Sequence, residues 1–146
     1  MRIFAGSSAR WTLRTVVSRD ETVCKYQLEK HDVRNDGTLR YTALLPGPDG
    51  TRSVFRISGL SESDVWGMGL EKVAQIRHLP LLGRFDLIAG VVYDQELRFA
   101  VDADLSSRHA EIVGWPEEKE KKRSIAQVLA AEATVRVRPR TEEVTI

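Results

Sequence analysis

Arg108 and His109 are the residues with the clearest potential for chemistry, because they stand together in a stretch, residues 102–114, that shows little pattern of its own. A histidine titrates near neutral pH and can transfer protons, and an adjacent arginine can hold a phosphate or another anion. The stretch leads into Pro116, a residue typical of the first position of a helix, whose amino end attracts anions. The pair could therefore serve a phosphate-containing substrate, with His109 as acid or base.

A structural role is the other interpretation of this pair. The sequence identifies no partner for His109, and a lone histidine is a weak catalytic signal. Glu117 and Glu118 would also repel an anion from the amino end of the helix. We therefore favour the interpretation in which Arg108 and His109 hold their loop against the sheet through hydrogen bonds.

Arg56 is a second candidate for anion binding, because it interrupts an otherwise apolar stretch that reads as a strand. Side chains alternate between the two faces of a strand, so Val54 and Arg56 share one face while Phe55 and Ile57 share the other. We expect Phe55 and Ile57 to face the core and Arg56 to point outward. By the same alternation, Arg84 and Asp86 are expected to form an ion pair across the sheet.

Trp115 is a candidate for ligand contact, because an indole can stack on a base or another ring. It stands directly before a predicted helix, so a role in pinning the start of that helix is the favoured interpretation. Gly114 would let the backbone turn there. Trp66 falls on the apolar stripe of another predicted helix and is expected in the core.

No complete catalytic or metal-binding motif is present in the sequence. Cys24 is the only cysteine, so the chain has no internal disulfide, which suits a reducing compartment. His31, His78 and His109 show no metal-ligand spacing relative to Cys24. Phosphate-binding glycine loops and the Gly-x-Ser-x-Gly motif are also missing from the printed residues. We therefore predict no metal site and no cofactor.

Hydrophobic alternation and turn signals predict the elements that must position these residues. Strands are expected over residues 11–18, 22–28, 39–45, 53–57, 84–92, 97–101 and 134–138. The prolines and glycines of residues 46–50 predict a hairpin that joins the third and fourth of these strands. Helices are expected over residues 61–78, with Ser61 as the N-cap, and from Pro116 to about Ala133. Residues 102–114 are predicted to be irregular.

This order of elements predicts an α+β fold, in which an antiparallel β-sheet of hairpins is covered on one face by two amphipathic helices. The 146 residues, with 42% hydrophobic and 29% charged residues, suit one packed domain. We assign that domain to residues 1–138 and a flexible C-terminal tail to residues 139–146.

Two segments carry a resemblance to other proteins. One is Ser53–Leu60 with its Val-Phe-Arg-Ile-Ser-Gly-Leu run, and the other is Arg108–Pro116 with Arg-His-Ala and Ile-Val-Gly-Trp-Pro. Together they resemble a group of small uncharacterised bacterial proteins. The resemblance implies a bacterial origin and a single domain, and it transfers no activity and no catalytic residue.

Two hypotheses about function follow. The first is a non-enzymatic binding or interaction module of the bacterial cytoplasm, with a protein or nucleic-acid partner or a second copy of the chain. A net charge of +1 argues against nucleic-acid binding driven by bulk charge, and no stretch is long and apolar enough to suggest a membrane partner. The alternative is a small enzyme that acts on a phosphate-containing or nucleic-acid substrate.

The position of three side chains distinguishes the two hypotheses. The enzyme requires His109 as acid or base, with Arg108 and Arg56 holding the anion in one open pocket. If these side chains lie on separate faces, or if His109 is fully hydrogen-bonded, the enzyme hypothesis loses its site.

Overall fold

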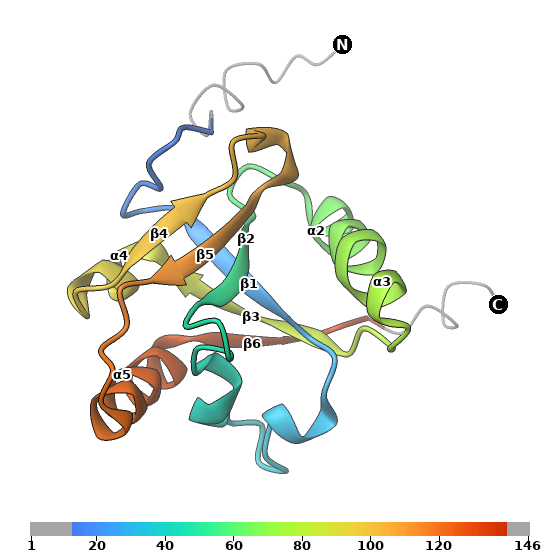
Figure 1. Cartoon of the computed structure of the whole chain (residues 1–146). Helices are drawn as coiled ribbons and strands as arrows, with labels where there is room; N and C mark the ends of the chain where they lie inside the picture. The colour runs from blue at the N-terminus through green and yellow to red at the C-terminus, as the bar shows by residue number, and fades with distance from the viewer. Residues whose placement is uncertain (1–12, 140–146) are drawn as a thin grey trace, which may run out of the picture.

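An open, six-stranded antiparallel sheet forms the centre of the protein, in the order β4-β5-β2-β1-β3-β6 (Figure 1). The computed structural model describes residues 13–139. The strands are β1 (Thr22–Gln27), β2 (Arg52–Arg56), β3 (Gly83–Ile88), β4 (Arg98–Val101), β5 (His109–Val113) and β6 (Thr134–Val137). Every neighbouring pair is antiparallel, so the predicted α+β class and antiparallel sheet are confirmed.

The helices are α2 (Glu62–Gly69), α3 (Gln75–Arg77), α4 (Ala89–Asp94) and α5 (Lys119–Glu132). A π-helical turn, Leu70–Ala74, joins α2 to α3, so the helix predicted over residues 61–78 is present. The Ser61 hydroxyl accepts a hydrogen bond from the Asp64 backbone N–H at 3.1 Å and caps this helix as predicted. None of the helices in residues 13–139 is both long and apolar enough to cross a membrane.

Helices pack on both faces of the sheet, whereas the sequence predicted that two helices would share one face. Val23 and Cys24 are consecutive in β1 and belong to two different hydrophobic clusters. The Cys24 cluster includes Val65 of α2, and the Val23 cluster includes Leu129 of α5 (Figure 1). Sequence periodicity shows that each helix has an apolar stripe but does not show which face of the sheet the stripe covers.

The predicted hairpin over residues 39–57 does not form. Residues Tyr41–Leu44 make a 3₁₀ turn, and β2 pairs with β1 and β5 instead. Ala43 and Leu44 are neighbours and are both buried in the same cluster. A strand cannot bury two consecutive side chains on one face, whereas a helical turn can. The strand predicted over residues 39–45 was therefore wrong in its local geometry.

Residues 102–114, predicted to be irregular, contain β5, an interior strand of the sheet. Its Ala110 and Ile112 are fully buried, while His109 and Glu111 on the other face stay partly exposed. This is a short alternating pattern, which the polar neighbours on both sides obscure in the sequence.

The remaining strand predictions had mixed outcomes. β1, β4 and β6 lie within predicted strands, whereas the strand predicted over residues 84–92 ends at Ile88 and continues as α4. Residues 13–18 form no regular element, and the rest of that predicted strand lies outside the described residues. The predicted tail, residues 139–146, also lies outside them beyond Pro139.

Two arginines are buried in the sheet, although Arg56 was expected to point outward; the ion pair expected between Arg84 and Asp86 is present. Arg56 is 1% exposed, and its guanidinium donates two hydrogen bonds to the Glu21 carboxylate, at 2.8 and 2.7 Å. Arg84 is 2% exposed and pairs with Asp86 on its own strand and with Glu62 of α2. Because both faces of the sheet are covered, an alternating polar residue can be buried, and each arginine is paired with a carboxylate.

We expect Arg56→Met to lower the free energy of unfolding by about 3–5 kcal/mol, because the Glu21 carboxylate would stay buried without its partner. Chemical denaturation followed by circular dichroism measures this change. Arg98→Met, at an exposed arginine on β4, is the matched control and should change the free energy by less than about 0.5 kcal/mol. Equal effects of the two substitutions would contradict a structural role for the Arg56–Glu21 pair.

Candidate functional site

The three side chains of the enzyme hypothesis do not converge on one pocket. His109 pairs with Phe55 across β5 and β2 and therefore lies on the face opposite Arg56. Arg56 is occupied by Glu21. Arg108 has a left-handed backbone, with φ 62°, and its guanidinium donates to the backbone oxygens of Arg56 and Ser58 at 3.0 and 3.2 Å. Arg108 therefore ties its loop to β2, as the structural interpretation expected.

His109 has three side-chain partners, none of which the sequence identified. Its Nδ1 lies 3.0 Å from Asp102, and its Nε2 lies 2.6 Å from Glu111 and 3.1 Å from the Ser53 hydroxyl. Asp102 also accepts a hydrogen bond from Ser107. Glu111 is opposite Ser53 in the β5–β2 pairing, so the register of two distant strands assembles the cluster.

The order Ser53–His109–Asp102 resembles the relay of a serine hydrolase, but Glu111 changes its chemistry. The Ser53 hydroxyl donates to the Glu111 carboxylate, so its proton is directed away from the imidazole that would have to accept it. Carboxylate oxygens of Asp102 and Glu111 lie within hydrogen-bonding distance of the two ring nitrogens of His109. The cluster is therefore a hydrogen-bonded network that joins the β4–β5 loop to β2.

Trp115 has the structural role that the sequence favoured. Its indole N–H donates to the backbone oxygen of Ile112 at 3.1 Å, and its ring packs against the core cluster that contains Leu129 of α5. Gly114 adopts φ 90°, as the predicted turn requires. α5 begins at Lys119 with Glu118 as N-cap, so Pro116 precedes the helix rather than opening it.

A cavity of about 300 Å³ lies where β1 and β2 separate. The two strands pair only through Val23↔Arg56 and Cys24↔Phe55, and they diverge beyond that point (Figure 1). Side chains from both faces of the sheet and from three neighbouring turns line the cavity: Lys25, Tyr26, Leu28, Glu29, Asp32, Thr42, Ala43, Arg52, Ser53, Phe55, Val73 and Arg77. Such a mixture of apolar wall and convergent polar groups is typical of a small-molecule site.

Three cationic side chains meet at this cavity. The Lys25 ammonium lies 3.6 Å from Asp32, and burial lowers the pKa of Lys25, with the charges of Arg52 and Arg77 adding to this effect. Burial also lowers the pKa of Arg52, whose guanidinium donates to the backbone oxygen of Leu45. Within residues 13–139, neither Arg52 nor Arg77 forms a side-chain ion pair. The cavity therefore favours a negatively charged group.

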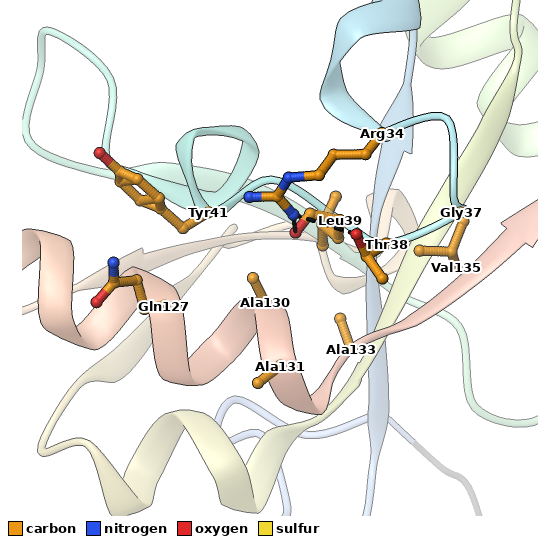
Figure 2. A pocket seen from close by; sticks show the side chains of 10 residues that line it. All are labelled: Arg34, Gly37, Thr38, Leu39, Tyr41, Gln127, Ala130, Ala131, Ala133 and Val135. Atoms are coloured by element: carbon orange, nitrogen blue, oxygen red, sulfur yellow. Dashed lines mark hydrogen bonds between the residues drawn. The ribbon is translucent and has the colours of Figure 1, made fainter.

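A second, wider cavity of about 640 Å³ lies between α5 and the turn before residue 41 (Figure 2). Small side chains form much of its wall, including Ala130, Ala131 and Ala133 (Figure 2). The one charged side chain that lines it, Arg34, donates to Thr38 and to the backbone oxygen of Leu39. This groove offers fewer free polar groups than the β1–β2 cavity, which we take as the candidate site.

Metal and thiol chemistry have no evident site in the described residues. No group of three or more histidine, cysteine or acidic side chains within residues 13–139 is arranged to hold a metal ion. Cys24 is buried, and burial raises the pKa of its thiol far above the ordinary range, so the reactive thiolate is suppressed.

Comparison with protein-family models, with curated proteins and with solved structures finds no significant match for this chain. The assignment of the candidate site therefore rests on the geometry and the charges of its residues alone.

We expect His109→Ala to raise the pKa of Asp102 toward its ordinary value, because the hydrogen bond with His109 is the main cause of its lowered pKa. Ser107→Ala should raise it less, since the Ser107 hydrogen bond is the second cause. A lowered folded-state pKa stabilises the fold above the unfolded pKa, and this contribution disappears as pH falls through the lowered value. Carbon NMR titration of the Asp102 carboxyl group measures the shift, and a larger effect of Ser107→Ala would contradict this order.

Proposed function

We propose that this protein is a non-enzymatic binding module that holds the anionic group of a small ligand in the β1–β2 cavity. The observation that carries the proposal is the convergence of Lys25, Arg52 and Arg77 on one cavity, where two carboxylates, Asp32 and Glu29, are also among the lining groups. Like charges held close together disfavour one another, and a bound anion relieves that repulsion.

The walls of the cavity also suit a ligand with an apolar body. Tyr26 and Phe55 stand 5.7 Å apart between ring centroids, and Leu28 and Val73 complete an apolar side. A cavity of about 300 Å³ corresponds to about ten water molecules at their share of liquid volume. The ligand that fits has about as many non-hydrogen atoms, with its charge toward the three cations and its body against the rings.

For the cellular location, we keep the expectation from the sequence. We propose a module of the bacterial cytoplasm, consistent with a single buried cysteine. The anionic group can belong to a free small molecule, or a protein or nucleic-acid partner can present it as a terminal carboxylate or a phosphate.

NMR titration with hydrocinnamate and with inorganic phosphate tests the proposal. We expect the amide resonances of Lys25, Arg52 and Arg77 to move on addition of either anion. Arg77→Gln should weaken binding about two- to fivefold, as expected for an exposed charge. Arg98→Gln removes an exposed charge on β4, which does not adjoin β1, and should leave binding unchanged. If neither anion moves these resonances, the proposal is wrong.

Serine hydrolysis is a second candidate function, favoured by the Ser53–His109–Asp102 order and by the position of Ser53 at the cavity. A fluorophosphonate probe tests it. We expect no covalent labelling, because Glu111 rather than His109 accepts the Ser53 proton. Labelling that disappears in both Ser53→Ala and His109→Ala would support the enzyme in place of the binding module.

A further inference from the structure

The Asp32 carboxylate carries an unsatisfied acceptor at the wall of the β1–β2 cavity. Its Oδ2 atom is buried and accepts no hydrogen bond from the described residues. The nearest cation, the Lys25 ammonium, lies 3.6 Å away, beyond hydrogen-bonding distance. A buried acceptor without a donor is costly, and such groups in proteins commonly face a ligand or a water molecule.

Backbone hydrogen bonds hold the turn that carries Asp32. Asp32 ends the 3₁₀ turn Lys30–Asp32, where its N–H donates to the Glu29 oxygen and its carbonyl accepts from the Arg40 N–H at 2.8 Å. The Val33–Leu39 bridge closes the loop directly after it. These bonds hold the Asp32 backbone beside the cavity, and the Asp32 side chain is one of the groups that line it.

We infer that the ligand of this cavity is zwitterionic, with a hydrogen-bond donor such as an ammonium group in addition to its anionic group. This inference rests on the proposed function, because it assigns the anionic group to Lys25, Arg52 and Arg77. The donor is assigned to Asp32, with Glu29 as a second negative charge on the same wall. A ligand of this kind matches both signs of charge in the cavity and leaves the net charge of the site unchanged.

The volume of the cavity narrows the class of ligand further. A cavity with room for about ten non-hydrogen atoms and an aromatic wall of Tyr26 and Phe55 fits a free amino acid or a similar amino-carboxylate. A long peptide or a nucleotide with several phosphates exceeds this volume, so either could enter only with one end.

Matched ligand pairs that differ by one amino group test the inference. Hydrocinnamate and phenylalanine form one pair, and hexanoate and 6-aminohexanoate form the other. The ammonium and carboxylate groups are close together in phenylalanine and far apart in 6-aminohexanoate, so the two pairs test two spacings of charge. We expect at least one amino-bearing member to bind about tenfold more tightly than its partner acid, the effect of one hydrogen bond between charged groups. Calorimetry or NMR titration of the full chain measures both affinities.

Asp32→Asn should remove this preference, because a neutral amide oxygen accepts a weaker hydrogen bond from an ammonium than a carboxylate does. The affinity for the plain acid should stay the same or rise, because a negative charge beside Lys25 is removed. Glu29→Gln is the matched control, since it removes an exposed carboxylate of the same cavity without touching the buried acceptor. In the unsubstituted protein, the carboxyl carbon resonance of Asp32 should move further with the amino-bearing ligand than with the acid, so the result does not depend on the folding of a variant.

The outcomes of these titrations distinguish a failure of the proposed anion-binding function from a failure of the zwitterionic-ligand inference. If neither member of either pair binds, the proposed anion-binding function fails. If the plain acids bind and the amino group adds no affinity in either pair, the binding function stands and the zwitterionic ligand is refuted. A preference that survives in Asp32→Asn would also refute the role of Asp32.

Discussion

The buried ion pair between Arg56 and Glu21 stabilises the junction of β1 with β2. The rest of the architecture depends on this junction. Glu21 directly precedes β1, and Arg56 is the last residue of β2. Close to the pair, the Thr22 N–H donates to Ser58 and its carbonyl accepts from Ile57, while Arg108 donates to the backbone of Arg56 and Ser58. A buried ion pair is stable only when its geometry is good and its remaining hydrogen bonds are made. Both conditions are met at this end of the strands.

The candidate site is a consequence of the same junction. Because β1 and β2 are joined firmly at one end and pair through only two residue pairs, they separate toward the other end and leave a cavity in the sheet. Strands that pair along their whole length would place Lys25 and Ser53 beside a continuous ladder with no room for a ligand. The His109 network holds Ser53 from the β5 side, so hydrogen-bonded side chains hold both the closed end and one rim of the cavity.

Several predictions from the sequence failed for the same physical reason. Alternation correctly placed Val54 and Arg56 on one face of a strand, but it implied that this face was exposed, whereas α5 and the turn at Ala43 and Leu44 cover it. The segment of His109 was expected to be a loop because its polar residues mask a short alternating pattern. His109 was judged to lack a partner because its segment was expected to be irregular. In the structure, strand β5 puts Glu111 on the same face as His109, and the β2 pairing adds Ser53 from 56 residues away. In each case the missing information was which strands form and how they pair.

The sequence by itself determined the local features of this protein: the apolar alternation of β1 and β6, the helix capped by Ser61, the turn at Gly114 and the α+β class. These depend on interactions between residues close together in the chain, and local patterns record them. Only the tertiary structure decided which carboxylates pair with Arg56 and His109, and that Lys25, Arg52, Arg77 and Asp32 share one cavity. Those contacts depend on strand register and on which face each helix covers, and both are decided by how the whole core packs.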